Sequence, residues 1–124
     1  DRNLIGLGLT TEAECAARVL TTVVSRPVAD RAVVDAGSKS LAMDPYRDGG
    51  YGHVVGRPEL AVARLSEEHG VLEFPAGAEL KVGDRLEIIP NHICPAINLV
   101  DRVYGVRAGR VVAEIPIEGR GRNT

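Results

Sequence analysis

The sequence predicts a mostly β fold: a small antiparallel β-barrel or sandwich with one or two short helices. Valine is frequent, and its β-branched side chain packs well on a pleated surface. The 14 glycines and 7 prolines divide the apolar segments into short runs, as turns between strands do. A length of 124 residues fits one domain that spans the whole chain, residues 1–124.

The N-terminal half is expected to contain short strands and one long loop. Asn3–Leu9 is apolar and contains glycine, which is typical of a strand end. Ala16–Arg26 is rich in β-branched residues and predicts a strand that ends at Pro27. Arg31–Asp35 is a second compact apolar strand. Asp44–Gly56 is rich in glycine and proline, so a long loop is expected, and long ordered loops are often functional.

The C-terminal half predicts two hairpins, one further strand and a helix. Leu60–Leu65 and Val71–Phe74 flank a polar corner and are expected to pair, and Arg85–Ile89 follows a Gly-Asp turn. Pro95 suits the first position of a short helix that reaches about Leu99. Near the C-terminus, Ala108-Gly109 between two apolar segments is a strong hairpin signal. Those segments are Asp101–Arg107 and Arg110–Ile117.

Composition excludes several classes of partner. The formal net charge is −2, with 15 basic and 17 acidic residues, and aromatic residues make up only 3% of the chain. Binding of nucleic acid is therefore not expected. No apolar run approaches the ~20 residues of a membrane helix, so no membrane contact is expected. Two cysteines do not make a disulfide framework, which fits a reducing cytoplasmic setting.

The strongest chemical signal is His92-x-Cys94, between a strand and the predicted helix. On extended chain two such side chains can face the same way, and imidazole with thiolate is a zinc-type ligand pair. Two protein ligands leave positions open, which suits catalysis rather than a structural zinc site. The spacing alone fits equally a buried cysteine beside a hydrogen-bonded histidine, and without further information it favours that interpretation.

Five segments together resemble the C-terminal domain of the D-serine dehydratase-like family, which includes the metal-activated D-threonine aldolases. They occur in the order and at about the spacing of the family. They are VVSRP (Val23–Pro27), DAGSKSLAMD (Asp35–Asp44), GYG (50–52), SEEHG (Ser66–Gly70) and PNHICPAINL (Pro90–Leu99), which contains the His-x-Cys-Pro metal motif. In those enzymes an N-terminal α/β barrel of the alanine-racemase type binds pyridoxal phosphate, and the β domain packs beside it.

The resemblance implies a function and a set of site residues. His92 and Cys94 match the metal-binding positions, and Cys94 stands where aldolase-like members have aspartate, so zinc and a dehydratase are favoured. The implied function is the metal-binding domain of a pyridoxal-phosphate-dependent lyase of D-3-hydroxy amino acids. Dehydration of D-serine to pyruvate and ammonia comes first and D-threonine-type aldol cleavage second. The barrel is absent from this chain, a homodimer is expected, and the isolated chain should be inactive. The alternative is a free-standing β-barrel binding or interaction module.

Four other features are weaker candidates. Tyr51 on the glycine-rich loop is a candidate cofactor contact, or else a loop aromatic packed on glycines. His69 is a candidate neighbour of the metal ligands, or else part of a solvated hairpin corner, and the roles of Glu67 and Glu68 stay open. Lys39 is expected to be a structural or interface residue. An apolar patch or groove rimmed by the glycine-rich loop is expected to face the barrel or a second subunit. The polar tail GRGRNT (119–124) is expected to fray.

Overall fold

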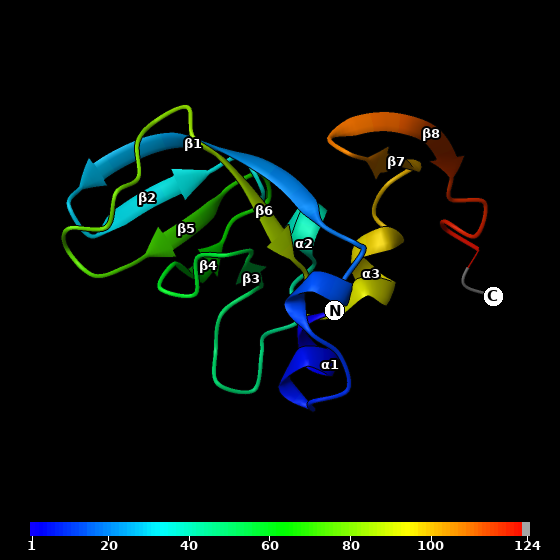
Figure 1. Cartoon of the computed structure of the whole chain (residues 1–124), viewed down its shortest axis with the longest axis horizontal. Helices are drawn as coiled ribbons and strands as arrows, with labels where there is room; N and C mark the ends of the chain where they lie inside the picture. Colours follow the sequence, from blue (N-terminus) through cyan, green and yellow to red (C-terminus); the bar gives the residue numbers. More distant parts are fainter. Residues whose placement is uncertain (123–124) are drawn as a thin grey trace.

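A computed structural model describes residues 1–122; the last two residues of the polar tail, for which fraying is predicted, lie outside the described part. The strands are β1 (Val19–Val28), β2 (Arg31–Val34), β3 (His53–Val54), β4 (Ala61–Leu65), β5 (Gly70–Glu73), β6 (Arg85–Ile89), β7 (Arg102–Arg107) and β8 (Arg110–Pro116). The first six close an antiparallel barrel in the order β1-β2-β5-β4-β3-β6, and β7 pairs with β8 in a separate sheet (Figure 1). The predicted small β-barrel is confirmed.

The short helices lie at one end of the barrel (Figure 1). They are α1 (Arg2–Gly6), the 3-10 helix η1 (Glu12–Glu14), α2 (Ser38–Leu41) and α3 (Ile93–Ile97). Within residues 1–122 there are therefore three short α-helices where the sequence predicted one or two. The predicted strand end at Asn3–Leu9 was wrong, because the Asp1 carboxylate accepts the Leu4 N–H at 3.2 Å and caps a helical turn. None of the described helices is long and apolar enough to cross a membrane.

Two boundaries of the barrel strands differ from the prediction. β1 continues past Pro27 to Val28, because its pairing with β2 shifts register between Ser25 and Val28. A proline can lie in such an irregular stretch, since its missing N–H then costs no ladder hydrogen bond. The loop at Asp44–Gly56 also contains the short strand β3, which pairs with both β4 and β6 and so closes the barrel.

The interior of the barrel is filled by aliphatic side chains from alternating positions of its strands. Val23, Val34, Val54, Leu72 and Ile88 are all 1% exposed or less. This alternation is the period of two that a half-buried strand requires. The β-branched segments that predicted the strands therefore also supply the core.

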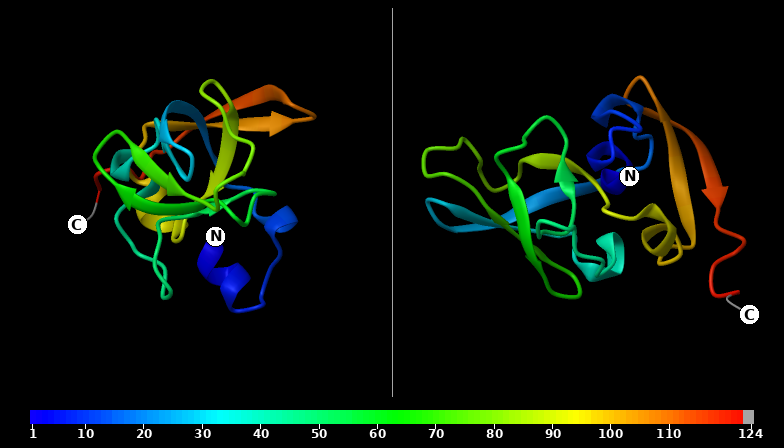
Figure 2. Two further views of the ribbon diagram at one scale, coloured as in Figure 1. Left: turned by 90° about the vertical axis from the view of Figure 1, so that its left-hand side faces the viewer. Right: turned by 90° about the horizontal axis from the view of Figure 1, so that it is seen from below.

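The β7–β8 hairpin projects beyond the barrel (Figure 2). Its turn residues Ala108 and Gly109 both have positive φ, 49° and 73°, as a two-residue hairpin turn with the twist of the strands requires. All seven residues of β8 are exposed. The predicted hairpin is confirmed, but it adds little to the core of the barrel.

The loop between β2 and α2 is bound to the β4–β5 turn. The N–H groups of Ser38 and Lys39 donate to the carbonyls of Ser66 and Glu67, at 2.8 and 3.1 Å. Gly37 lies so close to the turn that an added Cβ would be 2.3 Å from the Glu67 carbonyl oxygen. The DAGSK and SEEHG segments, far apart in sequence, therefore form one structural unit.

The Asp35 carboxylate makes this region sensitive to acid. It accepts hydrogen bonds from the Thr21 hydroxyl at 2.6 Å and the Thr22 N–H at 2.7 Å. These bonds, that of Thr21 first, hold the pKa of Asp35 below its ordinary value of 3.8. Because the folded-state pKa is the lower one, the stabilisation is complete above pH 3.8 and is lost as the pH falls through the folded-state value.

We expect Asp35→Asn to lower the free energy of unfolding at pH 7 by less than about 1 kcal/mol, since solvent screens this exposed carboxylate. The difference from wild type should shrink as the pH falls through the lowered pKa of Asp35, because the wild-type carboxylate then becomes protonated as well. Urea unfolding at pH 7, 4 and 2.5 measures it. Asp30→Asn, at another exposed position, is the matched control, and a pH-independent difference for Asp35→Asn would contradict the prediction.

Candidate metal site and the adjoining groove

His92 and Cys94 lie at the start of α3. His92 is the residue before the first helical turn, and its side chain is 47% exposed. Cys94 lies within the first turn, and its thiol is free and exposed. The helix begins at Ile93 rather than at Pro95, which lies in the first turn, where its missing N–H is tolerated. Cys94 is therefore helical, and the argument from alternation on extended chain does not apply to the pair.

A carboxylate lies beside the imidazole of His92. Asp44 Oδ2 is 3.4 Å from His92 Nδ1, and the Asp44 side chain is 52% exposed. Buried Asn91, 1% exposed, donates from Nδ2 to the main-chain carbonyls of Asp44 at 2.8 Å and Gly50 at 2.9 Å. Sequence reasoning missed both roles, although Asn91 directly precedes His92 and Asp44 ends the DAGSKSLAMD segment. Within residues 1–122 no group of three or more His, Cys, Asp or Glu side chains is placed so that it could hold a metal ion.

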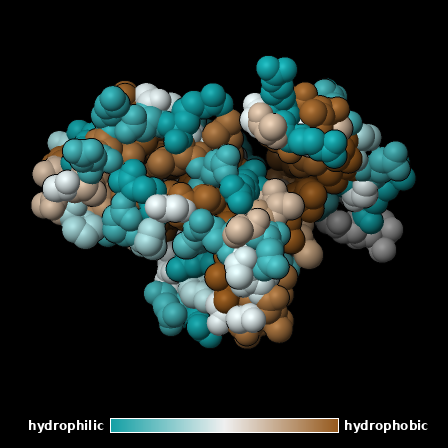
Figure 3. Space-filling model, viewed as in Figure 1, coloured by the Kyte–Doolittle hydropathy of each residue, from teal (hydrophilic) through white to brown (hydrophobic). Residues whose placement is uncertain are grey.

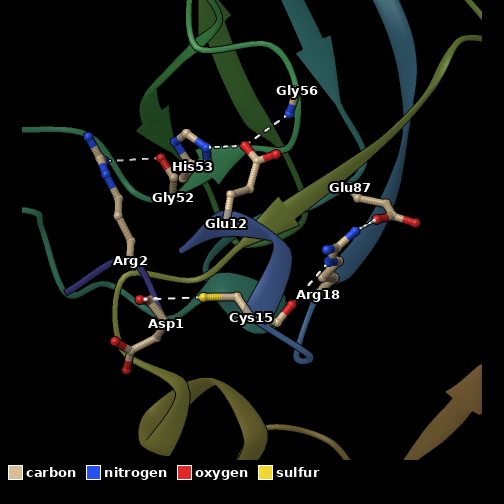
Figure 4. A network of polar contacts seen from close by, with 9 residues as sticks. All are labelled: Asp1, Arg2, Glu12, Cys15, Arg18, Gly52, His53, Gly56 and Glu87. Carbon is tan, nitrogen blue, oxygen red and sulfur yellow. Dashed lines mark hydrogen bonds and ion pairs between the residues drawn. The ribbon is translucent and has the colours of Figure 1, made fainter. Parts of the chain in front are cut away.

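The first residues of the chain support the segment that contains His92. The N–H of Arg2 donates to the Pro90 carbonyl at 3.0 Å, and the Asp1 carboxylate accepts the Ile93 N–H at 3.1 Å. The Arg2 guanidinium also donates to the Gly52 carbonyl at 3.0 Å (Figure 4). The N-terminal segment and the glycine-rich loop therefore meet at the strand end that leads to His92.

A second polar contact fixes η1 to the barrel. Glu12 Oε2 lies 2.6 Å from His53 Nε2 and accepts the Gly56 N–H at 3.0 Å (Figure 4). The Gly56 N–H and the His53 side chain lower the pKa of Glu12. His53 is thus engaged in holding the N-terminal segment, away from the His92 contact with Asp44.

Tyr51 and His69, the weaker candidates for site residues, both make contacts within the fold. Tyr51 is half-buried and packs against the core, and its N–H donates to the Val62 carbonyl at 3.0 Å. His69 is exposed in the β4–β5 turn, where its N–H donates to Ser66 Oγ at 3.2 Å. The cofactor role of Tyr51 and the metal-site role of His69 stay predictions, because neither contact involves a ligand.

Lys39 lies between two carboxylates. Its Nζ is 2.7 Å from Glu68 and 3.0 Å from Glu67. Glu68 first, and then Glu67, raise the pKa of the Lys39 ammonium. An amine that stays protonated is a poor nucleophile. The geometry therefore supports a structural role for Lys39 and assigns the two glutamates to the same exposed ion-pair cluster.

An apolar groove of about 460 Å³ separates the barrel from the hairpin. It is lined by the start of β1, by α3 and by the β7–β8 hairpin, and includes Leu20, Val106 and Val111, which are 55%, 63% and 64% exposed. Figure 3 shows apolar side chains gathered below the hairpin, at the notch beside the barrel. An exposed apolar groove was predicted, and the projecting hairpin forms its rim. The glycine-rich loop lines a second hollow of about 370 Å³, with Gly49, Gly50 and His53 among its residues.

Fold and site together define a small β-barrel domain with an exposed histidine and an exposed cysteine at the start of α3, a helix that also lines the apolar groove. Residues 16–106 match the serine dehydratase domain family. The chain belongs to this family, as its five sequence segments predicted.

The relatives of this chain are of two lengths. An uncharacterised protein of Mycobacterium tuberculosis is 38% identical over 129 residues, which cover 99% of this chain and 97% of that protein. The 3-hydroxy-D-aspartate aldolase of Paracoccus denitrificans is 40% identical over 111 residues, which cover 90% of this chain but only 27% of the aldolase. The domain therefore occurs both nearly alone and as about a quarter of a longer enzyme.

Solved structures confirm the same fold in longer enzymes. The crystal structure of D-threonine aldolase from Filomicrobium marinum matches with a TM-score of 0.75 and 34% identity, over 86% of this chain and 29% of that chain. D-threo-3-hydroxyaspartate dehydratase from Delftia sp. HT23 matches with a TM-score of 0.82 and 27% identity, over 94% of this chain and 36% of that chain. In both enzymes the matched domain is about a third of the polypeptide.

Proposed function

We propose that this chain is the metal-binding β domain of a pyridoxal-phosphate-dependent lyase that acts on D-3-hydroxy amino acids. The observation that supports this most is the exposed His92-x-Cys94 pair in a chain of the serine dehydratase domain family. The relatives with named activities are a 3-hydroxy-D-aspartate aldolase, a D-threonine aldolase and a D-threo-3-hydroxyaspartate dehydratase. Their named substrates share a D-configured α-carbon and a hydroxyl on the β-carbon.

The donor set fits zinc. Imidazole nitrogen and thiolate sulfur are the ligands that zinc prefers, and both side chains are open to solvent and to a substrate. A zinc ion held by His92 and Cys94 would polarise the β-hydroxyl of the substrate and make it a better leaving group. Solved variants of the dehydratase lack a histidine and, two positions further along, a cysteine, and the cysteine variant is described as metal-free. The same spacing separates His92 from Cys94.

In this proposal the chemistry is divided between the β domain and an N-terminal α/β barrel of the alanine-racemase type. Pyridoxal phosphate, held by the barrel, would stabilise negative charge at the α-carbon of the amino acid. This domain would position the hydroxyl, with Tyr51 as the candidate cofactor contact and His69 as the candidate neighbour of the metal ligands. Cys94 favours zinc over harder ions and so favours dehydration of D-serine to pyruvate and ammonia, with aldol cleavage second.

The apolar groove is the proposed contact surface for the N-terminal α/β barrel. The longer relatives have most of their length outside the matched domain, and the exposed groove needs a covering partner. A homodimer and a cytoplasmic location complete the proposal, both by analogy with the family.

A second candidate is a free-standing binding module. The M. tuberculosis relative supports it, because the matched region makes up 97% of that protein. The reading frame upstream of Asp1 separates the two candidates. A barrel with a cofactor lysine encoded in the same frame supports the lyase, and a start codon close to Asp1 supports the module.

Zinc titration of the purified chain tests the metal assignment. We expect weak binding by wild type and an affinity at least about tenfold lower for Cys94→Ala, because half of the protein donor set is gone. Wild-type affinity should also fall at low pH, since zinc competes with protons for the thiolate and the imidazole. Cys15→Ala, which removes the buried thiol, is the control. Equal affinities for wild type and Cys94→Ala would refute the assignment.

A further inference from the structure

The imidazole of His92 has two nitrogens, and the structure gives only one of them an ionic neighbour among the described residues. Nδ1 is 3.4 Å from Asp44 Oδ2. A histidine that binds a metal through one nitrogen usually donates the N–H of the other to a carboxylate, which fixes the tautomer and the direction of the ring. We propose that Asp44 is the positioning residue of the metal site: it holds Nδ1 of His92 and leaves Nε2 as the metal donor. This inference rests on the proposed function.

The backbone holds Asp44 in place for this contact. Asn91 is 1% exposed, and its amide donates to the main-chain carbonyl of Asp44 at 2.8 Å and to that of Gly50 at 2.9 Å. Arg2 Nη1 lies 3.4 Å from the amide oxygen of Asn91. Since Asn91 immediately precedes His92, one buried side chain joins the Asp44 segment to the segment that contains His92. The two side chains therefore meet through a fixed backbone rather than through a loose loop.

The Asp44 carboxylate is also available for His92. Within residues 1–122 its only ion-pair neighbour is His92, whereas Asp48 in the same loop lies 3.5 Å from Arg47. A separation of 3.4 Å is an ion-pair distance, longer than the ~2.7–3.2 Å of an ordinary N–H···O hydrogen bond. The proposal therefore requires the two side chains to approach when the metal binds, and χ2 of histidine is a soft torsion. With a metal bound at Nε2, the Nδ1–H of His92 would be a stronger hydrogen-bond donor to Asp44.

The test uses the full chain, labelled with nitrogen-15 at histidine, with zinc added and with zinc removed. Long-range proton–nitrogen spectra report which nitrogen of His92 is protonated and which binds zinc. In wild type we expect a protonated Nδ1 in both states and zinc on Nε2. Asp44→Ala should shift the zinc-free ring towards the Nε2–H tautomer and weaken zinc binding about 10- to 100-fold. Asp44→Asn, whose amide oxygen can still accept the Nδ1–H of His92, should lose less zinc affinity than Asp44→Ala.

Asp48→Ala is the matched control, because it removes a carboxylate from the same loop without touching His92, and it should leave both readouts unchanged. Zinc bound through Nδ1, or directly to Asp44, would overturn the proposal. So would an Asp44→Ala variant with wild-type affinity and tautomer. If no variant bound zinc, the metal assignment under the proposed function would fall, and the zinc-free tautomers would still decide the role of Asp44.

Discussion

Replacing Cys94 by alanine, in the enzyme that joins this domain to its pyridoxal-phosphate barrel, should lower the release of pyruvate from D-serine by about 100-fold or more. The thiolate is one of two proposed protein ligands, and the metal that they would hold would act on the leaving hydroxyl. Under the proposal the N-terminal α/β barrel binds the cofactor, so the cofactor absorbance should change little. The two effects therefore separate in one sample, with pyruvate release followed beside the cofactor spectrum.

Cys15→Ala is the control for this experiment, since it removes the other thiol, which is buried and donates towards the Asp1 carbonyl at 3.8 Å. It should leave pyruvate release close to wild type. The chain without a barrel should release no pyruvate. A Cys94→Ala enzyme with wild-type release in metal-free buffer would refute both the metal assignment and the choice of a dehydratase.

Gly37→Ala is expected to destabilise the fold by about 1–3 kcal/mol, the range of an overpacked interior. The added Cβ would lie 2.3 Å from the carbonyl oxygen of Glu67 and 2.5 Å from that of Ser66. Both atoms belong to the backbone of the β4–β5 turn, which cannot move without breaking its hydrogen bonds to Ser38 and Lys39. Urea unfolding of the zinc-free chain measures the effect.

Gly119→Ala is the matched control: an added Cβ there meets nothing within 4 Å, and the backbone conformation suits any residue. Its midpoint of unfolding should stay at the wild-type value. If Gly37→Ala unfolded at the same urea concentration as Gly119→Ala, the close contact between the two segments would not exist in solution.

The sequence by itself determined five of the six barrel strands and the pair of donors; β3, a strand of two residues inside the predicted loop, was missed. Strands can be predicted because their signal is local: Leu86 and Ile88, both buried in β6, are two residues apart, and glycine and proline mark the turns. The β7–β8 turn is readable for the same reason, since Ala108-Gly109 sets its own backbone conformation. The His92-x-Cys94 motif can be recognised from the sequence alone, because two residue types that bind metals are two positions apart.

Only the tertiary structure decided what surrounds those donors. Asp44 reaches His92 because Asn91, buried under the glycine-rich loop, binds the main-chain carbonyls of Asp44 and Gly50, contacts that join residues more than 40 positions apart. The groove likewise depends on the angle at which the β7–β8 hairpin leaves the barrel. α1 replaced a predicted strand because the Asp1 side chain caps it and its backbone pairs with Pro90. Local propensity does not predict these tertiary contacts, because their free energy comes from groups that meet only after the chain has folded.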